Sequence, residues 1–371
     1  MIAILTGGPG LGAHVTGLLL RRRLKELGAS SEVFLAEAFW QPGRRDRISA
    51  SKEAYQRDFR LARVGQRLFR NLSDAFDPIL IESAKKRWHD GAVHRFVVFS
   101  GLWLPVVESY AAEFGAVPVD VCHADSANSP SFARRAESLD RHREVWLFDS
   151  AGNEIPWTIR ATTEPPLRWE DRDRRVLAHG GGWSMGTYLE RAAELSAAGL
   201  PLDLVVRDAG EAPDLAPGSR RFMMDPSWSP WHDDGFPPFG EIVAGAPPVY
   251  EQAEDHHQAL DLTRHAVAIM AKLGGGTILD AFTAATPIIC LEGYGEHEDR
   301  NVQFCVDLGI GITFEMWRDT GFSLEPLARM HRRLLDLHDR PRDYARELAA
   351  GQARSSPSPG SSAWSSPGCS T

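Results

Sequence analysis

Short apolar runs alternate along this chain with segments in which apolar residues recur every three or four positions. The apolar run at 2–5 predicts a strand, and the leucine spacing at 15–27 predicts a helix that ends at Gly28. Residues 31–36 predict the next strand. A strand, a turn, a helix and a second strand in this order begin a parallel sheet, so we expect an α/β fold.

The same alternation continues to residue 350. It predicts further strands at 95–99, 118–122, 175–178, 202–207 and 287–291, and a short helix followed by a strand within 260–273. It predicts further helices at 103–114, 188–198, 277–285 and, as one or two segments, 325–350. The proline-rich segment 159–174 predicts the linker between two domains, 1–165 and 174–350. Residues 351–371 have too few apolar side chains to pack and are predicted to be disordered.

The composition is that of a globular protein: 371 residues, 43% of them hydrophobic and 25% charged. The net charge of −9 argues against a nucleic-acid partner. The first residues lack the basic start of a signal peptide, and no apolar stretch could span a bilayer, so we expect a cytoplasmic protein without stable membrane association. The four cysteines have no CxxC spacing, which favours reduced thiols. The oligomeric state stays open.

Two glycine-rich turns are the most informative feature of the sequence. One occupies 6–14 and carries His14, and the other occupies 272–277; each follows a predicted strand and precedes a predicted helix. Small residues let backbone N–H groups approach an anion there, and the helix dipole favours negative charge. A histidine can move a proton near neutral pH. A phosphate cradle in one half and a base in the other predict a group-transfer enzyme that works across a cleft.

The first turn also fits a weaker alternative. The spacing Gly8-x-Gly10-x-x-Ala13 satisfies the dinucleotide fingerprint, with Glu32 or Glu37 as the ribose acid. An NAD-dependent oxidoreductase would hold pyrophosphate at this turn. That hypothesis leaves the second turn without a role.

Three polar segments carry open alternatives. The strongly basic segment 42–70 is interpreted as an exposed loop and helix with a solvated face, or else as a patch for an anionic partner or substrate. The tryptophan-rich loop 228–234 is interpreted as a surface loop packed on itself, with stacking on a base or sugar as the alternative. The histidines at 232 and 256–257 match no metal-ligand spacing; we interpret 255–257 as an exposed helix start and expect no metal site.

The block 272–301, KLGGGTILDAFTAATPIICLEGYGEHEDRN, resembles the nucleotide-sugar site of GT-B glycosyltransferases, both the natural-product sugar transferases and the MurG-type N-acetylglucosaminyltransferases. The turn that ends at His14 is similar to the N-terminal glycine-rich turn of that family. The resemblance implies a GT-B fold, with two facing Rossmann-like domains and an interdomain cleft. It also implies inverting sugar transfer, with a UDP-sugar or other nucleotide sugar as co-substrate and no metal or further cofactor.

The same resemblance assigns roles to individual residues. The C-terminal half is expected to bind the donor, with the diphosphate at the glycine turn, the ribose on Asp280 and the sugar beyond the next strand. The implied donor-binding residues are Gly182, Lys272, Gly275, Gly276, Thr277, Asp280, Glu296, His297 and Asn301. The implied acceptor-binding residues are Gly12, Ser100, His123, Asp125 and Ser126. His14 is expected to remove a proton from the acceptor.

One position departs from the family. Many relatives orient the catalytic histidine with an aspartate, and the aligned residue here is Ser100. Asp125 could replace that aspartate, His14 could act unassisted, or the acceptor could be acidic enough to need little help.

The acceptor is the least determined part. Few long apolar loops surround the N-terminal site, and the apolar patch of MurG-type enzymes is not evident, so we expect a small polar acceptor in natural-product biosynthesis. Transfer to a nucleobase in a nucleoside antibiotic, as in enzymes similar to cytosylglucuronic acid synthase, is one specific form. A nucleotide-sugar 2-epimerase of GT-B shape and a catalytically silent partner protein are the rival hypotheses.

Overall fold

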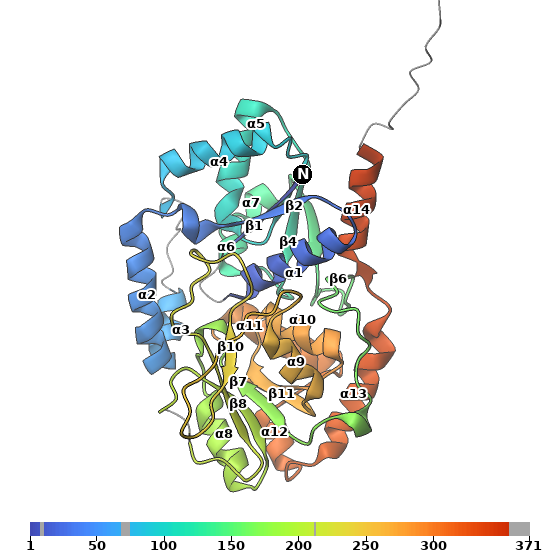
Figure 1. Cartoon of the computed structure of the whole chain (residues 1–371). Coiled ribbons are helices and arrows are strands. Elements are labelled where there is room, and N and C mark those ends of the chain that lie inside the picture. Colours follow the sequence, from blue (N-terminus) through green and yellow to red (C-terminus); the bar gives the residue numbers. More distant parts are fainter. Residues whose placement is uncertain (8–10, 68–74, 211–212, 356–371) are drawn as a thin grey trace, which may run out of the picture.

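The computed structural model describes residues 1–7, 11–67, 75–210 and 213–355, which form two α/β domains, one above the other in Figure 1. Gly8 and Gly10 of the dinucleotide fingerprint lie outside the described residues. Each domain has its own sheet, and the last helix returns to the N-terminal domain.

The N-terminal domain is built on five parallel strands in the order β2-β1-β3-β4-β5. They are β1 (Ile2–Thr6), β2 (Ser31–Leu35), β3 (Arg95–Val98), β4 (Val119–His123) and β5 (Arg143–Trp146). All of β1 is buried, and its side chains alternate between two cores: Ile2 and Ile4 enter one, Ala3 and Leu5 the other. Helices therefore have to cover both faces, which explains why the strand is continuously apolar.

Helices on the two faces of this sheet supply those cores. Leucines of α1 (Gly12–Glu26) share one core with α14 (Tyr344–Ser355). The other core contains Trp88 of α4 (Pro78–Asp90) and Tyr110 of α5 (Leu104–Phe114). Two short helices, α6 (Pro130–Ala133) and α7 (Ala136–Leu139), lie between β4 and β5.

The C-terminal domain has a seven-stranded sheet in the order β10-β9-β8-β7-β11-β12-β13. Its strands are β7 (Val176–His179), β8 (Leu202–Val206), β9 (Arg220–Met224), β10 (Phe239–Glu241), β11 (Ala268–Lys272), β12 (Ile288–Leu291) and β13 (Gly311–Thr313). Its helices are α8 (Tyr188–Ala197), α9 (Gln258–His265), α10 (Gly275–Ala284), α11 (Glu296–Asp307), α12 (Phe314–Asp319) and α13 (Leu324–His338). Only β10 runs antiparallel to its neighbour in this sheet. The sequence predicted β7, β8, β11 and β12 of this sheet, but not β9, β10 or β13.

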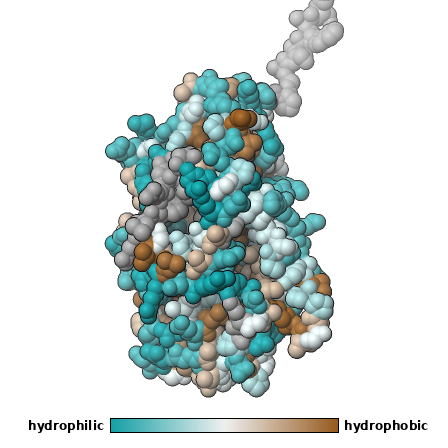
Figure 2. Space-filling view, turned by 90° about the vertical axis from the view of Figure 1, so that its left-hand side faces the viewer, coloured by the Kyte–Doolittle hydropathy of each residue, from teal (hydrophilic) through white to brown (hydrophobic). Residues whose placement is uncertain are grey.

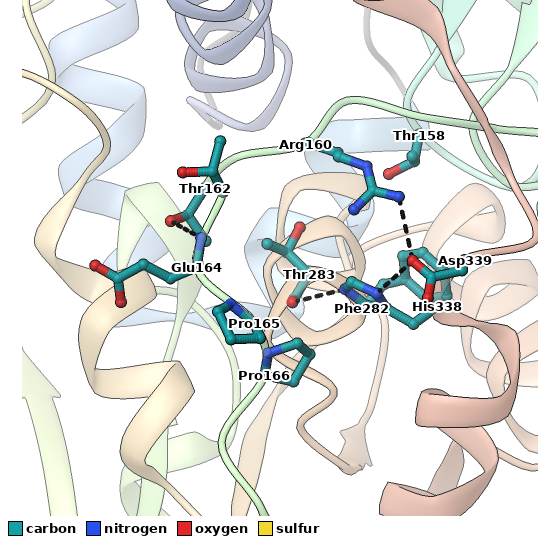
Figure 3. Close-up of a pocket in the computed structure, with 11 residues that line it drawn as sticks. Thr158, Arg160, Thr162, Glu164, Pro165, Pro166, Phe282, Thr283, His338 and Asp339 are labelled. Atoms are coloured by element: carbon teal, nitrogen blue, oxygen red, sulfur yellow. Dashed lines mark hydrogen bonds and ion pairs between the residues drawn. The ribbon is translucent and has the colours of Figure 1, made fainter.

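The linker is anchored to the C-terminal domain by Arg172. Its buried guanidinium donates hydrogen bonds to the carbonyl oxygens of Ala266 and Ala285 and to the Thr286 hydroxyl, among others. Burial lowers the pKa of Arg172 to about 10, so it keeps its charge at neutral pH. A separate cavity of about 220 Å³ lies between the linker and α13, where Arg160 contacts Asp339 (Figure 3).

The chain crosses back to the N-terminal domain after α13, along the right-hand side of Figure 1. On the way, β14 (Arg342–Asp343) pairs with β6 (Trp157–Thr158). The Tyr344 hydroxyl then donates to the buried Asp120 carboxylate at 2.7 Å. Helix α14 continues to residue 355, five residues into the segment that was predicted to be disordered. Residues 356–371 lie outside the described part.

The basic segment forms two helices, α2 (Pro42–Arg57) and α3 (Phe59–Arg67), on the left of Figure 1. They reach the C-terminal domain, where Ala62 packs against Trp183 and Met185. The segment therefore bridges the domains rather than forming only a solvated surface.

The cysteines agree with the expectation of reduced thiols. Cys122, Cys290 and Cys305 are free and buried, and burial raises the pKa of each. Cys369 lies outside the described residues. None of the helices in the described ranges combines the length and the apolar character that crossing a bilayer requires.

Candidate active site

The candidate active site is a cleft of about 980 Å³ between the two domains. It opens where α1 of the N-terminal domain faces α10 of the C-terminal domain (Figure 1). The carboxyl ends of β4, β7 and β11 contribute His123, His179 and Lys272 to its lining. Ligands of open α/β sheets bind at this end of the strands, so the topology of both sheets favours a ligand here.

The amino end of α10 lies in this cleft without a cap from a side chain of its own segment. Its N-cap is Gly274, and the lining continues through Gly275, Gly276 and Thr277. The first amides of a helix have no acceptor within the helix and carry the positive end of its dipole. An anion from the other domain occupies part of this end, because the Gly275 N–H donates to Asp125 Oδ1 at 2.8 Å.

The two domains approach each other closely at this point. A Cβ atom on Gly275 would lie 2.1 Å from the carbonyl oxygen of Ala124, whereas one on Gly276 would lie 3.4 Å from the Gly12 Cα atom. The first distance is a collision and the second is close to ordinary contact. The close approach of the domains therefore requires glycine at 275 but not at 276.

Asn301 joins the two domains beneath the cleft. Its side chain donates to Asp125 Oδ1 at 2.8 Å and to the Leu273 carbonyl oxygen at 2.8 Å. Its Oδ1 accepts from the backbone N–H of Ser126 at 2.7 Å. Asn301 and Ser126, which the sequence assigned to donor and acceptor, are buried and do not line the cleft. Their polar groups hold the loop after β4 against the end of β11.

A buried ion pair lies beside the donor helix. Lys272 Nζ is 2.7 Å from Glu298 Oε1, and both residues line the cleft. Burial would raise the pKa of Glu298, but Lys272, with His297, outweighs this and holds it below its ordinary value. His297 also lines the cleft, whereas the expected Glu296 is exposed and does not. Residues two apart on a helix point to nearly opposite sides, so Glu298 faces inward when Glu296 faces outward.

Asp280 lies one turn along α10 and lines the cleft. Residues three and four apart share a helix face, so Asp280 lies on the side of Gly276 and Thr277. Its Oδ1 is 3.0 Å from Nε2 of His257. Burial opposes the charged form of His257, yet Asp280 raises its pKa above the ordinary value. A carboxylate held in place by an imidazole is a suitable acceptor for ligand hydroxyl groups.

His14 lies just behind the cleft. Only 2% of its surface is exposed, and its side chain does not line the cleft although Gly12 and Ala13 do. The Thr6 hydroxyl lies 3.0 Å from Nδ1 and donates its proton to the Phe34 carbonyl oxygen at 3.3 Å. When the hydroxyl proton is on the Phe34 side, Nδ1 carries the ring proton and Nε2 is bare, which is the tautomer that a base at Nε2 requires.

The environment keeps this imidazole neutral. Burial lowers the pKa of His14 to about 4, with Arg21 adding to the effect. Nε2 has no hydrogen-bond partner among the described residues. The residue that orients His14 is therefore Thr6, and neither Ser100 nor Asp125 takes that part.

The N-terminal part of the cleft is lined by Ser100 and His123 among others. The His123 ring stacks on Trp146 with centroids 3.7 Å apart. Its Nε2 is 2.9 Å from Glu144 Oε2, but burial lowers the pKa of His123 to about 3, so this contact is not an ion pair at neutral pH.

Several cleft residues escaped the sequence analysis. His257 is buried against Asp280 and is not part of an exposed helix start. Trp228 and Trp231 line the cleft, which favours the stacking alternative for their loop. Gly182, which the sequence analysis did expect among the donor-binding residues, also lines the cleft, in the turn that includes the short helix Gly181–Trp183. Across the described ranges, no three histidine, cysteine or acidic side chains gather as a metal site.

Three histidines, the buried His14 and His123 and the half-buried His179, predict a loss of stability in acid. Burial lowers the pKa of His14 and His179 to about 4 and that of His123 to about 3. Below pH 6.5 these histidines bind protons in the unfolded chain but stay neutral in the folded chain. The free energy of unfolding is therefore highest above pH 6.5 and falls towards pH 4. Urea unfolding should show a loss of roughly 1 kcal/mol per histidine between pH 7.5 and 5.5.

A His123→Phe variant provides the control. Phenylalanine keeps the stacking on Trp146 but cannot titrate. The variant should therefore lose less stability between pH 7.5 and 5.5 than the wild type, by the roughly 1 kcal/mol that one histidine contributes. An identical pH dependence in the two proteins would contradict the assignment.

No protein-family model matches the chain, and no curated protein matches its sequence. Solved structures match along almost its whole length. The spinosyn rhamnosyltransferase SpnG has a TM-score of 0.57 at 14% identity, covering 95% of this chain and 100% of its own. Glycosyltransferase VinC in complex with dTDP has a TM-score of 0.57 at 12% identity, covering 95% and 99%. MurG of Acinetobacter baumannii has a TM-score of 0.53 at 14% identity, covering 95% and 99%. These similarities show that the chain has the GT-B fold, with two facing Rossmann-like domains.

Proposed function

We propose that this chain is an inverting, metal-independent glycosyltransferase that moves a sugar from a UDP-sugar or other nucleoside-diphosphate sugar to a small polar acceptor. The observation that carries the proposal is the amino end of α10, which opens into the interdomain cleft, has no cap from its own segment and has Asp280 one turn further along the same helix. Backbone amides at a helix end suit a diphosphate, and a carboxylate beside them suits ribose hydroxyl groups.

Donor binding would exchange one anion for another. Asp125 accepts from the Gly275 N–H in the structure, and the donor diphosphate would take its place. Lys272 lies beside this end and would neutralise part of the added charge. The acceptor oxygen or nitrogen then attacks the anomeric carbon, the bond from that carbon to the diphosphate oxygen breaks, and the configuration inverts. The acceptor proton goes to Nε2 of His14.

The helix end and Lys272 stabilise the leaving diphosphate, so this mechanism needs no metal ion. The neighbour VinC was solved with dTDP, which supports a nucleoside diphosphate as the leaving group. The rhamnosyltransferase SpnG, with a spinosyn as its named substrate class, supports a natural-product acceptor. Transfer to a nucleobase in a nucleoside antibiotic remains one form of the proposal.

An Asp280→Asn variant should bind UDP about tenfold more weakly, since a hydrogen bond to a charged acceptor is lost. Isothermal titration calorimetry with UDP measures this directly. Asp261→Asn is the matched control: Asp261 accepts from His256 at 2.8 Å, as Asp280 does from His257, but it does not line the cleft. Equal losses in both variants would count against a ribose site at Asp280.

The transferase and epimerase hypotheses differ in what happens without an acceptor. NMR spectra of a UDP-sugar incubated with the enzyme alone should show no new donor sugar. Appearance of the 2-epimer would replace the transferase proposal with the epimerase.

A further inference from the structure

One face of α2 turns basic side chains towards the cleft. Arg44, Arg47, Ser51 and Tyr55 follow one another at three- and four-residue intervals, which places them on one helix face, and all of them line the cleft. Lys52 lines it as well. We call Arg44, Arg47 and Lys52 the α2 cations.

Contacts with the C-terminal domain hold this face over the cleft. Gln56 Nε2 donates to the Trp183 carbonyl oxygen at 2.8 Å, and the Tyr55 ring lies 6.4 Å from the Trp183 ring. Further along, Arg63 of α3 forms an ion pair with Glu292. Figure 2 shows the side of the molecule that carries α2 and α3, and hydrophilic residues cover most of it. The α2 cations are therefore part of the cleft wall and not an arm that extends into solvent.

Lys52 differs from the other lysine of the cleft. Lys272 has Glu298 as its partner, whereas Lys52 is half-buried with no hydrogen bond or ion pair to another described residue. Burial alone lowers the pKa of Lys52, with no carboxylate acting against it. A partly desolvated ammonium group without a counter-charge is stabilised when an anion binds.

Three of the four carboxylates that line the cleft are already engaged elsewhere. Asp125 binds the end of α10, Asp280 contacts His257, and Glu298 contacts Lys272. Glu53 of α2 also lines the cleft but is exposed. The protein as a whole carries a net charge of −9, so this concentration of positive charge is local.

The position of the α2 cations separates them from the donor phosphates. Side chains built at Gly181 and Gly186 would meet Lys272 at 3.6 to 3.9 Å. The same turn contacts α2 and α3 through Trp183. The turn therefore lies between Lys272, on the donor side, and α2, which belongs to the N-terminal domain.

We propose that the α2 cations bind a carboxylate or phosphate group carried by the acceptor, so that the enzyme acts on acidic acceptors. This inference rests on the proposed function, because it takes the N-terminal side of the cleft as the acceptor site. It gives the basic segment a role that the fold alone does not require. Because the cations all line the cleft from one helix, an acceptor with its anionic group at one end would be oriented as well as held.

The test uses two phenols that differ only in charge: 4-hydroxybenzoate and its neutral methyl ester. Calorimetry measures the binding of each to the wild type with and without saturating UDP. The wild type should bind the carboxylate at least tenfold more tightly than the ester, since hydrogen bonds to charged groups are worth about tenfold or more in affinity. Equal affinity for the two phenols, or no binding of either, overturns the proposal.

Two variants test whether the preference for the carboxylate comes from the α2 cations. An Arg47→Gln/Lys52→Gln double variant should lose the preference for the carboxylate and keep its affinity for the ester and for UDP. Arg57→Gln is the matched control, because Arg57 is an exposed cation of α2 that does not line the cleft. A preference that survives in the double variant, or that disappears in Arg57→Gln as well, overturns the proposal.

A final comparison identifies the source of the anion. If the double variant instead loses discrimination between UDP-glucuronate and UDP-glucose, the anionic group belongs to the donor sugar and the acceptor assignment is wrong. The UDP titration distinguishes a failure of the proposed function from a failure of the α2 cation site. Failure to bind UDP contradicts the proposed function, whereas the benzoate measurement without UDP still tests the α2 cations.

Discussion

A Gly275→Ala variant is expected to unfold at a lower temperature than the wild type and to transfer sugar about a hundredfold more slowly. The added methyl group would lie 2.1 Å from the Ala124 carbonyl oxygen, which belongs to the other domain. Alanine is the better helix former by roughly 0.5–1 kcal/mol, but overpacking costs about 1–3 kcal/mol, so the collision decides the sign. The domains must separate locally, and a shift of about 1 Å between reacting groups is enough for the kinetic loss.

Gly276→Ala is the control that separates helix propensity from collision. Its methyl group would lie 3.4 Å from the Gly12 Cα atom, so we expect unchanged or slightly raised stability. Differential scanning calorimetry gives both midpoints, and small-angle X-ray scattering shows whether only Gly275→Ala expands the molecule. A Gly275→Ala variant as stable and as compact as Gly276→Ala would show that the close approach of the domains does not persist in solution.

The fold was largely predictable because its signals are local. Continuous apolar runs marked strands such as β1, which helices cover on both faces, and glycine marked the turn into α10. The strands β9 and β10 were missed because they flank a loop rich in proline, tryptophan and phenylalanine, where no alternation is visible. Such an edge ribbon is stabilised by packing with distant segments rather than by its own sequence.

The candidate site was only partly predictable because contacts between distant segments decide it. Asn301 and Ser126 were assigned to substrates, yet they bond to each other across the domains, over 175 positions of sequence. Nothing in the sequence near His14 pointed to Thr6 as its partner, since the contact depends on how α1 packs against β1. Glu298 was overlooked in favour of Glu296 because the exact start of a helix, and with it the inward face, is the least certain part of a sequence prediction.

The tryptophan-rich loop 228–234 shows that the prediction of function from sequence has the same limit. Trp228 and Trp231 were interpreted as packed on their own loop, because tryptophan is frequent in both settings. The structure places them in the wall of the cleft, which residues of the basic helix α2 also line. A cleft that combines aromatic surfaces, cations and the amino end of a helix offers different chemistry to each part of a substrate, and no single segment of the sequence shows this combination.

His14 is the residue on which the proposed chemistry depends. Its Nδ1 is engaged with Thr6, so Nε2, which has no partner among the described residues, is the nitrogen proposed to accept a proton. The ring is buried behind Gly12 and Ala13, so the acceptor hydrogen must reach Nε2 past the first turn of α1. Burial lowers the pKa of His14 to about 4, which keeps Nε2 available throughout the neutral range.

Replacing His14 with glutamine should lower kcat by about a hundredfold to ten-thousandfold, the usual contribution of a positioned base, while UDP affinity stays unchanged. Because the base titrates near 4, kcat/KM of the wild type should stay level from pH 8 to 5.5 instead of falling through 6.5. Thr6→Val should slow transfer to a smaller degree, since Nδ1 loses its acceptor and the ring its fixed orientation. His331→Gln supplies the structural control: His331 is also buried, its Nδ1 lies 2.7 Å from the Ala285 carbonyl oxygen, and burial lowers its pKa, but it lies outside the cleft. If the two histidine variants lose stability alike and neither loses rate, His14 is a core residue and the base must be sought among the groups that line the cleft.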